Sequence, residues 1–430
     1  MKNVALYNLG CKVNSYETEL MRQMFQEKGY EIVPFDKTAD IYIVNTCTVT
    51  GIADRKSRQL LHRARRLNPQ AVVVAVGCYV QAGGGKDDSI DLAVGNDRKK
   101  DIVEMVEGYL AGREEVCCGE EHTPYLKRSQ EHTRTYIKIQ EGCNQFCSYC
   151  IIPYVRGRIH SRSQEDILQE IQAVVQAGCR EVVLTGIHIS SYGLDLEGGK
   201  ADGDRLLDLI ERIHEMKGVE RIRLGSLEPR IIRPETARRL AALPGLCPHF
   251  HLSLQSGCDA TLKRMNRHYT SGEYFTSVEI LREYFDRPAI TTDVIVGFPG
   301  ETQEEFCQTR EFLEKVSFYE MHIFKYSRRQ GTRAADMPGQ VPEQVKARRS
   351  GELLALEAEQ SREFRRHYIG QEAEVLLEER RELEGHAFWV GHTKDYVKVA
   401  VEEASWEGRL GANILVRVPV SKFLTDEILR

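Results

Sequence analysis

Three closely spaced cysteines lie near the middle of the chain. Cys143, Cys147 and Cys150 have the spacing C-x3-C-x2-C. Three such thiolates can bind three irons of a [4Fe–4S] cluster and leave the fourth iron without a protein ligand. That open iron can bind a substrate or cofactor, whereas a fully ligated cluster only carries electrons. The alternative is a structural zinc loop, but zinc sites of this kind usually show paired C-x2-C units.

A second set of cysteines is dispersed along the first eighty residues. Cys11, Cys47 and Cys78 each follow the end of a short apolar run. If these runs are parallel strands, their carboxyl ends lie at one edge of the sheet, where ligands bind. The pattern therefore predicts that the three thiols converge and hold a second cluster, again with an open iron. The alternative is three core cysteines that pack as small apolar side chains.

Composition limits the class of protein. The chain has 430 residues, 41% hydrophobic and 29% charged, with a net charge of −5, which is typical of a soluble globular protein of about three domains. No apolar run is long enough to span a membrane. The first residues lack the apolar core of a signal peptide, so we expect a cytoplasmic protein. In a reducing compartment the 12 cysteines favour metal binding or chemistry over disulfides.

The apolar pattern predicts an α/β multidomain protein. In residues 1–115, apolar runs at 4–7, 41–44 and 71–76 alternate with helical segments such as 15–28, which indicates a buried parallel sheet. A polar linker follows at 116–131; it contains Cys117 and Cys118, for which the sequence indicates no role.

Residues 132–368 repeat the alternation of strand and helix. Ser163 is expected to cap one helix, and Pro234 to open another. The series predicts a partial (βα)6 TIM-type barrel whose active site lies at the carboxyl ends of the strands, followed by a charged helix at 341–368. The expected strands are 136–139, 181–184, 221–224, 249–254, 292–296 and 321–326. Short alternating runs at 373–377, 396–400 and 414–418 then predict a small β-barrel in residues 369–430.

The first cysteine motif resembles that of the radical S-adenosylmethionine (SAM) enzymes, which place an aromatic residue, here Tyr149, before the last cysteine. The resemblance implies that the open iron binds SAM. One electron then cleaves SAM to methionine and a 5′-deoxyadenosyl radical, so the cofactor carries the difficult chemistry. No catalytic acid or base from the protein is expected.

Taken together, the two motifs resemble the methylthiotransferase family over essentially the whole chain. That resemblance implies two [4Fe–4S] clusters and a C-terminal barrel of the TRAM type. The sequence around Lys12 is similar to that of the branch of the family that acts on N6-threonylcarbamoyladenosine at position 37 of tRNA. The implied reaction activates adenine C2, inserts sulfur and methylates it with SAM. The segments that carry the resemblance are 9–19 (LGCKVNSYETE), 45–50 (NTCTVT), 77–79 (GCY) and 142–153 (GCNQFCSYCIIP).

Polar or small residues at the ends of the expected strands are candidates for SAM binding. The alternative for each is ordinary turn chemistry, but their shared position at one edge favours a functional role. The candidates are Tyr149, Thr185, Gly186, Ser226, Glu228, Gln255, Asp293 and Val296.

A basic segment soon after Cys47 is a candidate RNA-binding surface, because cationic side chains on a helix can contact phosphates. The alternative is a solvated helix face. The C-terminal barrel is not basic, with eight Lys and Arg against twelve Asp and Glu, so it would have to bind RNA by shape or stacking. The basic candidates are Arg55, Lys56, Arg58, Arg63, Arg65 and Arg66.

The expected partners are tRNA and a reductant such as flavodoxin or ferredoxin, with no membrane; the sequence does not indicate the sulfur donor. Two alternatives keep the chemistry but change the target, to N6-isopentenyladenosine in tRNA or to an aspartate of a ribosomal protein. Two others are not enzymes: an iron–sulfur electron carrier, and an RNA-binding protein with structural zinc.

Overall fold

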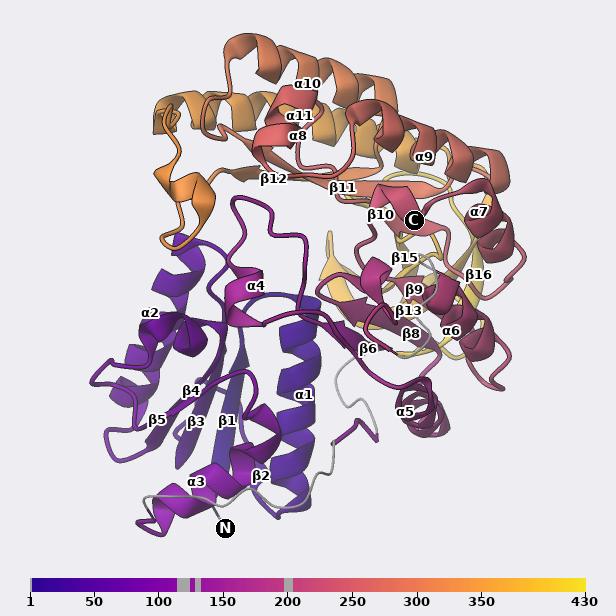
Figure 1. Ribbon diagram of the computed structural model, residues 1–430. Coiled ribbons are helices and arrows are strands. Elements are labelled where there is room, and N and C mark those ends of the chain that lie inside the picture. Colours follow the sequence, from indigo (N-terminus) through magenta and orange to yellow (C-terminus); the bar gives the residue numbers. More distant parts are fainter. Residues whose placement is uncertain (1, 114–123, 128–132, 197–203) are drawn as a thin grey trace. The chain divides into compact units, whose positions relative to one another are not determined.

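The structure is a computed structural model that describes residues 2–113, 124–127, 133–196 and 204–430 (Figure 1). Most of the predicted linker, including Cys117 and Cys118, lies outside the described residues. The contacts divide the chain into two compact units. The first comprises Met1–Lys127, Glu141–His160 and Ser327–Ala335, and the second Arg128–Gln140, Ser161–Tyr326 and Asp336–Arg430. In the described part of the chain, no helix has the length and apolarity needed to cross a membrane.

The first unit is built on a parallel sheet, as predicted. Its order is β2 (Glu31–Ile32), β1 (Asn3–Asn8), β3 (Ile41–Thr46), β4 (Val72–Gly77) and β5 (Leu92–Val94). Every neighbouring pair is parallel. All residues of β3 and β4 are buried, because helices cover both faces of the sheet.

Alternate side chains of these strands form two apolar layers. Ile41 and Ile43 pack in a cluster with Phe25 of α1 (Lys12–Glu27) and with residues of α3 (Ile102–Leu110). Tyr42 and Val44 pack in another cluster with Leu61 of α2 (Gly51–Leu67). The period-two alternation of a strand thus assigns one face of the sheet to α1 and α3 and the other to α2 (Figure 1).

In the described part of the second unit, the six strands of the strand–helix region pair in parallel in two groups. β6 (Arg134–Glu141), β8 (Glu181–Gly186) and β9 (Arg221–Leu224) are neighbours, with β7 (His160–Ser161) beside β6. β10 (His249–His251), β11 (Ala289–Val296) and β12 (Glu320–Lys325) form the other group. Single parallel bridges, Ile222 to Leu246 and Leu227 to Leu252, join the β9 region to the β10 region. The six predicted strands are confirmed, while their closure into a partial barrel stays a prediction.

Two of the helices between these strands begin where the sequence predicted. The Ser163 side chain accepts a hydrogen bond from the Asp166 N–H at the start of α5, and Pro234 opens α7. Cys179 lies outside the helix, because α5 ends at Gln176, and the Cys179 thiol donates to the Glu181 carbonyl. The helices are α5 (Gln164–Gln176), α6 (Asp204–His214), α7 (Pro234–Ala241), α8 (Asp259–Arg264), α9 (Ser271–Tyr284), α10 (Gln303–Val316) and α11 (Glu343–Arg366).

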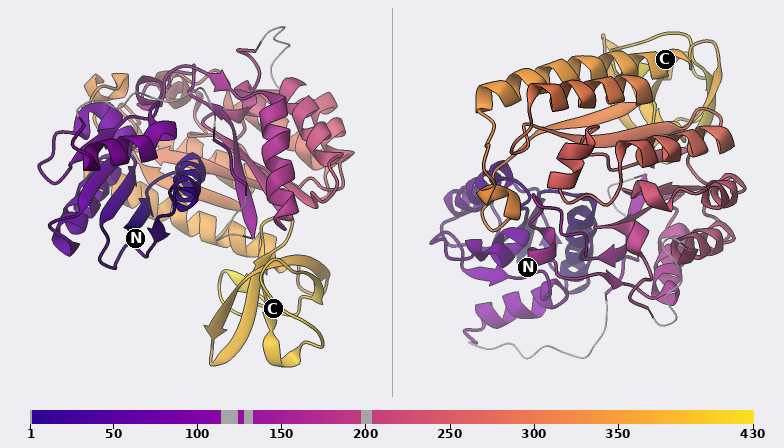
Figure 2. Two further views of the ribbon diagram at one scale, coloured as in Figure 1. Left: turned by 90° about the horizontal axis from the view of Figure 1, so that it is seen from below. Right: turned by 45° about the horizontal axis from the view of Figure 1, so that its top comes forward.

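The C-terminal strands form a five-stranded, mainly antiparallel sheet, seen in yellow in Figure 2. The predicted strand 396–400 begins instead at Lys398, because Tyr396 has a φ of 71° and ends a turn. Valine side chains dominate the apolar interior. The order is β16 (Leu415–Pro419), β13 (Glu372–Leu383), β14 (His386–His392), β15 (Lys398–Glu402) and β17 (Ile428–Leu429).

A buried ionic network lies between this sheet and the parallel strands of the same unit. Arg223 donates to Glu181 at 2.7 Å, and both side chains are about 2% exposed. The guanidinium groups of Arg134 and Arg223 each lie 4.8 Å from the centroid of the Tyr396 ring. Burial by itself would raise the pKa of Glu181, but Arg223 and its neighbouring arginines outweigh burial and lower that pKa to about 2.

We expect Arg223→Met to lower the free energy of unfolding by about 3 kcal/mol, because Glu181 loses its nearest counter-charge while remaining buried. Urea denaturation followed by circular dichroism measures this change. Arg239→Met is the matched control, since Arg239 pairs with Asp208 and Glu211 in a more exposed position; it should cost less than about 1 kcal/mol. Equal losses in the two variants would contradict the prediction.

Candidate functional site

The three early cysteines converge, as the strand pattern predicted. Cys47 and Cys78 directly follow the ends of β3 and β4, and Cys11 lies three residues after the end of β1. The Cys47 thiol interacts electrostatically with both Cys11 and Cys78. Gly10 allows a close approach, because a Cβ at this position would lie 3.0 Å from Sγ of Cys47. The convergence is confirmed, and the role of these thiols as iron ligands remains a prediction.

The surroundings of this trio suit an iron–sulfur cluster. The pKa of Cys47 is raised to about 11, mainly by burial and also by the neighbouring Cys11 and Cys78, although backbone N–H groups of Val49 and Thr48 act to lower it. A metal must therefore displace the Cys47 proton, as it does at any thiolate site. Arg156 Nε and Asn96 Nδ2 approach Cys78 Sγ at 3.3 and 3.6 Å. N–H groups directed at sulfur are typical of cluster ligands.

The C-x3-C-x2-C loop is held by tight local geometry. The Cys143 N–H donates to the Gly157 carbonyl at 3.1 Å, and the Cys150 N–H to the Cys147 carbonyl at 2.9 Å. The Gln145 N–H donates to Cys143 Sγ at 3.4 Å. This all-thiol loop, with an N–H directed at one sulfur, fits the open-iron cluster that its spacing predicts.

This loop belongs to the first compact unit, whereas the sequence pattern placed it within a domain at 132–368. After Cys150, the chain forms the short helix α4 (Ile152–Val155). Ile151 and Val155 pack in one apolar cluster with Cys78. Both cysteine trios are therefore parts of the same unit, because the segment that follows the loop is packed against the early sheet.

The SAM candidates of the second unit lie where parallel strands end. Gly186 ends β8, and a Cβ there would lie 2.9 Å from the Gln140 carbonyl oxygen, so the backbones approach closely. Thr185, just before it, is buried. Ser226 is exposed, whereas Glu228 is buried and pairs with His188 at 3.0 Å.

Gln255 and β11 are joined through the backbone. The Gln255 N–H donates to the Asp293 carbonyl at 2.8 Å, and the Ile295 N–H donates to the Gln255 carbonyl at 2.9 Å. Gln255 has a φ of 71°, a left-handed conformation for a residue with a side chain. Val296 is buried at the end of β11. Tyr149 is half-buried in the first unit.

Two histidines that the sequence analysis did not single out lie beside Asp293. The ligand atoms of His251, Asp293 and His322 are all within 4.8 Å of one another, on the adjacent strands β10, β11 and β12. His251 Nδ1 is hydrogen bonded to the Thr291 hydroxyl at 3.0 Å, and its Nε2 is 3.3 Å from an Asp293 carboxylate oxygen. The sequence signal that could have identified His251 is the alternation His249-Phe250-His251. A period of two is typical of a strand, and His251 lies within the expected strand 249–254.

The basic candidates lie on α2. Arg55, Lys56, Arg63 and Arg66 are exposed and fall within about 100° of the helix circumference. Arg58 is also exposed but is displaced toward Tyr79, to which it is hydrogen bonded.

Arg65 differs from its neighbours on the helix. It is half-buried and donates to an Asp91 carboxylate oxygen at 2.6 Å and to the Ala71 carbonyl at 2.9 Å. Because these contacts anchor α2 to the sheet of the first unit, we exclude Arg65 from the candidate RNA surface.

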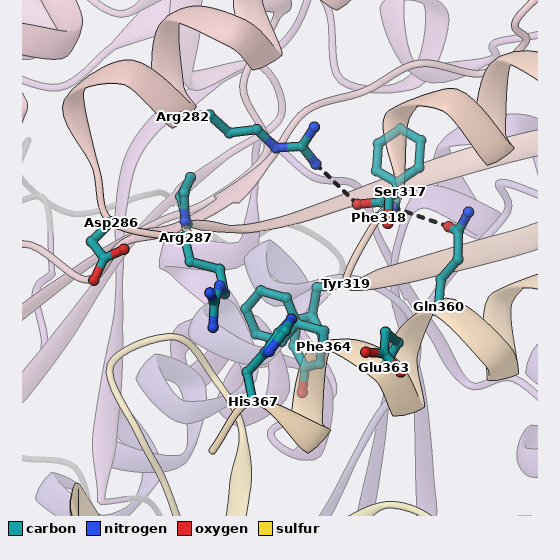
Figure 3. Close-up of a pocket in the computed structure, with 11 residues that line it drawn as sticks. Arg282, Asp286, Arg287, Ser317, Phe318, Tyr319, Gln360, Glu363, Phe364 and His367 are labelled. Carbon is teal, nitrogen blue, oxygen red and sulfur yellow. Dashed lines mark hydrogen bonds between the residues drawn. The ribbon is translucent and has the colours of Figure 1, made fainter. Parts of the chain in front are cut away.

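A cavity of about 320 Å³ lies at the opposite end of β11 from Val296 (Figure 3). Its walls come from the end of α9, the segment before β11, the segment after α10 and the later part of α11. Arg282 donates to the Val316 and Ser317 carbonyls at this site. The cavity includes none of the predicted SAM residues.

Comparison with known proteins finds families that match the regions carrying the two cysteine trios. Residues 137–313 match the radical SAM superfamily, and residues 3–94 match a family described as uncharacterized protein family UPF0004. Threonylcarbamoyladenosine tRNA methylthiotransferase MtaB of Bacillus subtilis is 39% identical, covering 97% of this chain and 94% of its own. The tRNA-2-methylthio-N(6)-dimethylallyladenosine synthase of Moorella thermoacetica is 35% identical, covering 100% and 95%.

A solved structure resembles the fold. The radical S-adenosylmethionine methyltransferase TsrM of Kitasatospora setae, with cobalamin and a [4Fe–4S] cluster bound, superposes with a TM-score of 0.55. It covers 76% of this chain and 72% of its own, at 17% identity. The radical SAM fold with parallel α/β sheets is thereby confirmed.

Proposed function

Because the chain belongs to the radical SAM methylthiotransferase family, we propose that it transfers a methylthio group to adenine C2 of N6-threonylcarbamoyladenosine at position 37 of tRNA. The observation that carries this proposal is the presence of two cysteine trios in one compact unit. An electron carrier would need only one fully ligated cluster, and structural zinc would need four ligands per site. Family membership sets both of these alternatives aside.

The cysteines have separate roles in this proposal. Cys143, Cys147 and Cys150 would hold the cluster that binds SAM, and Cys11, Cys47 and Cys78 would hold the auxiliary cluster. With SAM bound, such a cluster supplies one-electron chemistry that can activate an otherwise inert C–H bond. The remaining task of the chain is to position the cofactor and the nucleoside and to keep water out.

The strand-end residues are suited to positioning. Burial alone would raise the pKa of Glu228, but hydrogen bonding and charge from His188 outweigh it and lower that pKa to about 2. Glu228 is therefore a carboxylate at neutral pH and can accept hydrogen bonds from an ammonium or a ribose hydroxyl group. We propose that Glu228 and Asp293, together with the other strand-end candidates, bind the polar groups of SAM.

The choice of nucleoside is supported by the higher identity to the threonylcarbamoyladenosine enzymes. The second candidate is N6-isopentenyladenosine, because a relative named for the dimethylallyl nucleoside aligns over the whole chain. The test is an anaerobic assay of the reconstituted protein on two tRNAs, one carrying each modification, followed by mass spectrometry of the nucleosides. We expect the methylthio product only from threonylcarbamoyladenosine. Product only from isopentenyladenosine would overturn this substrate assignment.

We propose that Arg55, Lys56, Arg58, Arg63 and Arg66 contact tRNA phosphates. Replacing Arg55, Lys56, Arg63 and Arg66 by alanine should weaken tRNA binding at all sequences. It should also reduce the slope of log affinity against log salt by about 1 for each lost phosphate contact. Fluorescence anisotropy at several salt concentrations measures both quantities. Arg310→Ala with Arg348→Ala is the control, because these are exposed helical arginines in the second unit; an equal change of slope there would contradict the assignment.

The proposed reaction needs electrons and sulfur that other molecules supply. We propose a cytoplasmic flavodoxin or ferredoxin as the reductant, because SAM cleavage by such a cluster requires a single low-potential electron. The chain offers no signal for the identity of the sulfur donor.

A further inference from the structure

Arg156, which the sequence analysis did not single out, lies beside the early cysteines and is extensively hydrogen bonded. Its side chain is 1% exposed. A guanidinium group has five N–H donors and no acceptor, and here each donor has an acceptor. The acceptors are Cys78 Sγ (3.3 Å from Nε), Glu17 Oε1 and Oε2 (3.0 and 3.1 Å), Glu141 Oε1 (2.5 Å) and Asn14 Oδ1 (2.5 Å).

These acceptors come from separate parts of the first unit. Asn14 and Glu17 lie on α1, which begins directly after Cys11. Cys78 follows β4, and Arg156 itself directly follows α4, the helix after the C-x3-C-x2-C loop. Arg156 therefore links the segment after one cysteine trio to two of the three elements that carry the other.

The charges of this network are balanced before any cluster is considered. Glu17 also accepts a hydrogen bond from Lys99 Nζ at 2.5 Å, and both side chains are buried. Two cations, Arg156 and Lys99, thus face two carboxylates, Glu17 and Glu141. A thiolate at Cys78 adds a negative charge, and among the described residues the ionic group within hydrogen-bonding distance of its sulfur is the Arg156 guanidinium.

A second donor approaches the same sulfur. Asn96 Nδ2 lies 3.6 Å from Cys78 Sγ and also donates to the Val155 carbonyl at 2.8 Å. The α4 segment therefore holds both Arg156 and Asn96 in place against Cys78. By contrast, the N–H groups near Cys47 come from its own following residues, Thr48 and Val49.

We propose that Arg156 is a positioning residue for the auxiliary cluster, which fixes Cys78 as its hydrogen-bonded ligand and raises the reduction potential of that cluster. This inference rests on the proposed function only in assigning a cluster to Cys11, Cys47 and Cys78. Hydrogen bonds to a ligand sulfur favour the reduced cluster, because reduction adds negative charge that the donors stabilise. Because Arg156 directly follows α4, its hydrogen bond to Cys78 also links the redox state of the auxiliary cluster to the position of the C-x3-C-x2-C loop.

The test measures the reduction potential of the auxiliary cluster by itself. In full-length protein with Cys143, Cys147 and Cys150 replaced by alanine, the midpoint potential is determined by an EPR-monitored redox titration, with and without Arg156→Lys. A hydrogen bond to a charged group contributes about 1.5 kcal/mol. We therefore expect the reduction equilibrium to become about tenfold less favourable, which is a fall of about 59 mV for a one-electron couple.

Two further variants separate electrostatics from support of the fold. Asn96→Leu removes one donor without touching the ionic network and should shift the potential in the same direction by a smaller amount. Arg158→Lys is the matched control, because Arg158 lies over the Phe146 ring, 4.4 Å from its centroid, and should leave the potential unchanged. A full cluster content with an unchanged potential in both Arg156→Lys and Asn96→Leu would overturn the proposal.

Failure of the proposed function gives a different result. If the parent protein without Cys143, Cys147 and Cys150 binds no iron and sulfide, the auxiliary cluster itself is absent. In that case both the proposed function and the proposed role of Arg156 are wrong. If that cluster forms and its potential falls in Arg156→Lys, but neither tRNA is modified by the wild type, only the substrate assignment is wrong.

Discussion

Replacing Cys11, Cys47 and Cys78 together by alanine is expected to abolish methylthio product while leaving reductive cleavage of SAM intact. The variant should retain about half of the iron and sulfide of the wild type, since two clusters become one. The physical reason is that the two trios occupy separate loops, and the C-x3-C-x2-C loop keeps its own N–H to sulfur contact at Cys143.

The reciprocal variant, with Cys143, Cys147 and Cys150 replaced by alanine, is the control. It should also keep about half of the iron but form no 5′-deoxyadenosine. Iron and sulfide are quantified after anaerobic purification, and 5′-deoxyadenosine by liquid chromatography with dithionite as reductant. Full iron retention in the Cys11, Cys47 and Cys78 variant would show that the early trio does not bind a cluster.

Replacing Gly142 by alanine is expected to displace the C-x3-C-x2-C loop and remove most SAM cleavage. A Cβ at this position would lie 1.7 Å from the Arg158 carbonyl oxygen, and Gly142 has a φ of 69°. A backbone atom cannot move aside as a side chain can, so the loop must shift at the residue directly before Cys143. We expect loss of about half of the iron and a loss of activity of more than about tenfold.

Gly157→Ala provides a matched control in the same loop. Gly157 also has a positive φ, of 74°, but no atom lies within 4 Å of a Cβ built there. Both variants carry the cost of a left-handed alanine, about 1–2 kcal/mol, and only Gly142→Ala adds a clash. Iron content and SAM cleavage should therefore remain close to wild type in Gly157→Ala. Equal losses in the two variants would mean that backbone strain, and not the clash, explains the defect.

The two cysteine trios differ in how much of their environment is local. The C-x3-C-x2-C loop closes through hydrogen bonds between residues 3 to 14 positions apart, all within residues 143–157. The early trio depends on parallel pairing between β1, β3 and β4 and on Arg156, which is 78 residues from Cys78. We therefore expect the early site to be the more sensitive of the two to changes distant in the sequence.

Local and periodic features were predictable because each depends on neighbouring residues. Uninterrupted β-branched runs identified β3 and β4, and the position of Cys47 and Cys78 directly after those runs was enough to predict their convergence. Ser163 and Pro234 marked helix starts through capping and a fixed φ. The strand at Tyr396 was misplaced because its left-handed turn is stabilised by packing against Arg134 and Arg223, which are distant in the sequence.

The sequence by itself determined the family, the two cysteine trios and the parallel sheets, because ligand spacing and apolar periodicity can be seen directly in the order of the residues. Only the tertiary structure decided which charged side chains support the site. Arg65 is anchored to the sheet while Arg66 is exposed, and Arg156 meets Cys78, Glu17 and Glu141 in one buried network. The physical reason is that the partner of a buried charge is chosen by packing in three dimensions, and residue type and spacing do not record it.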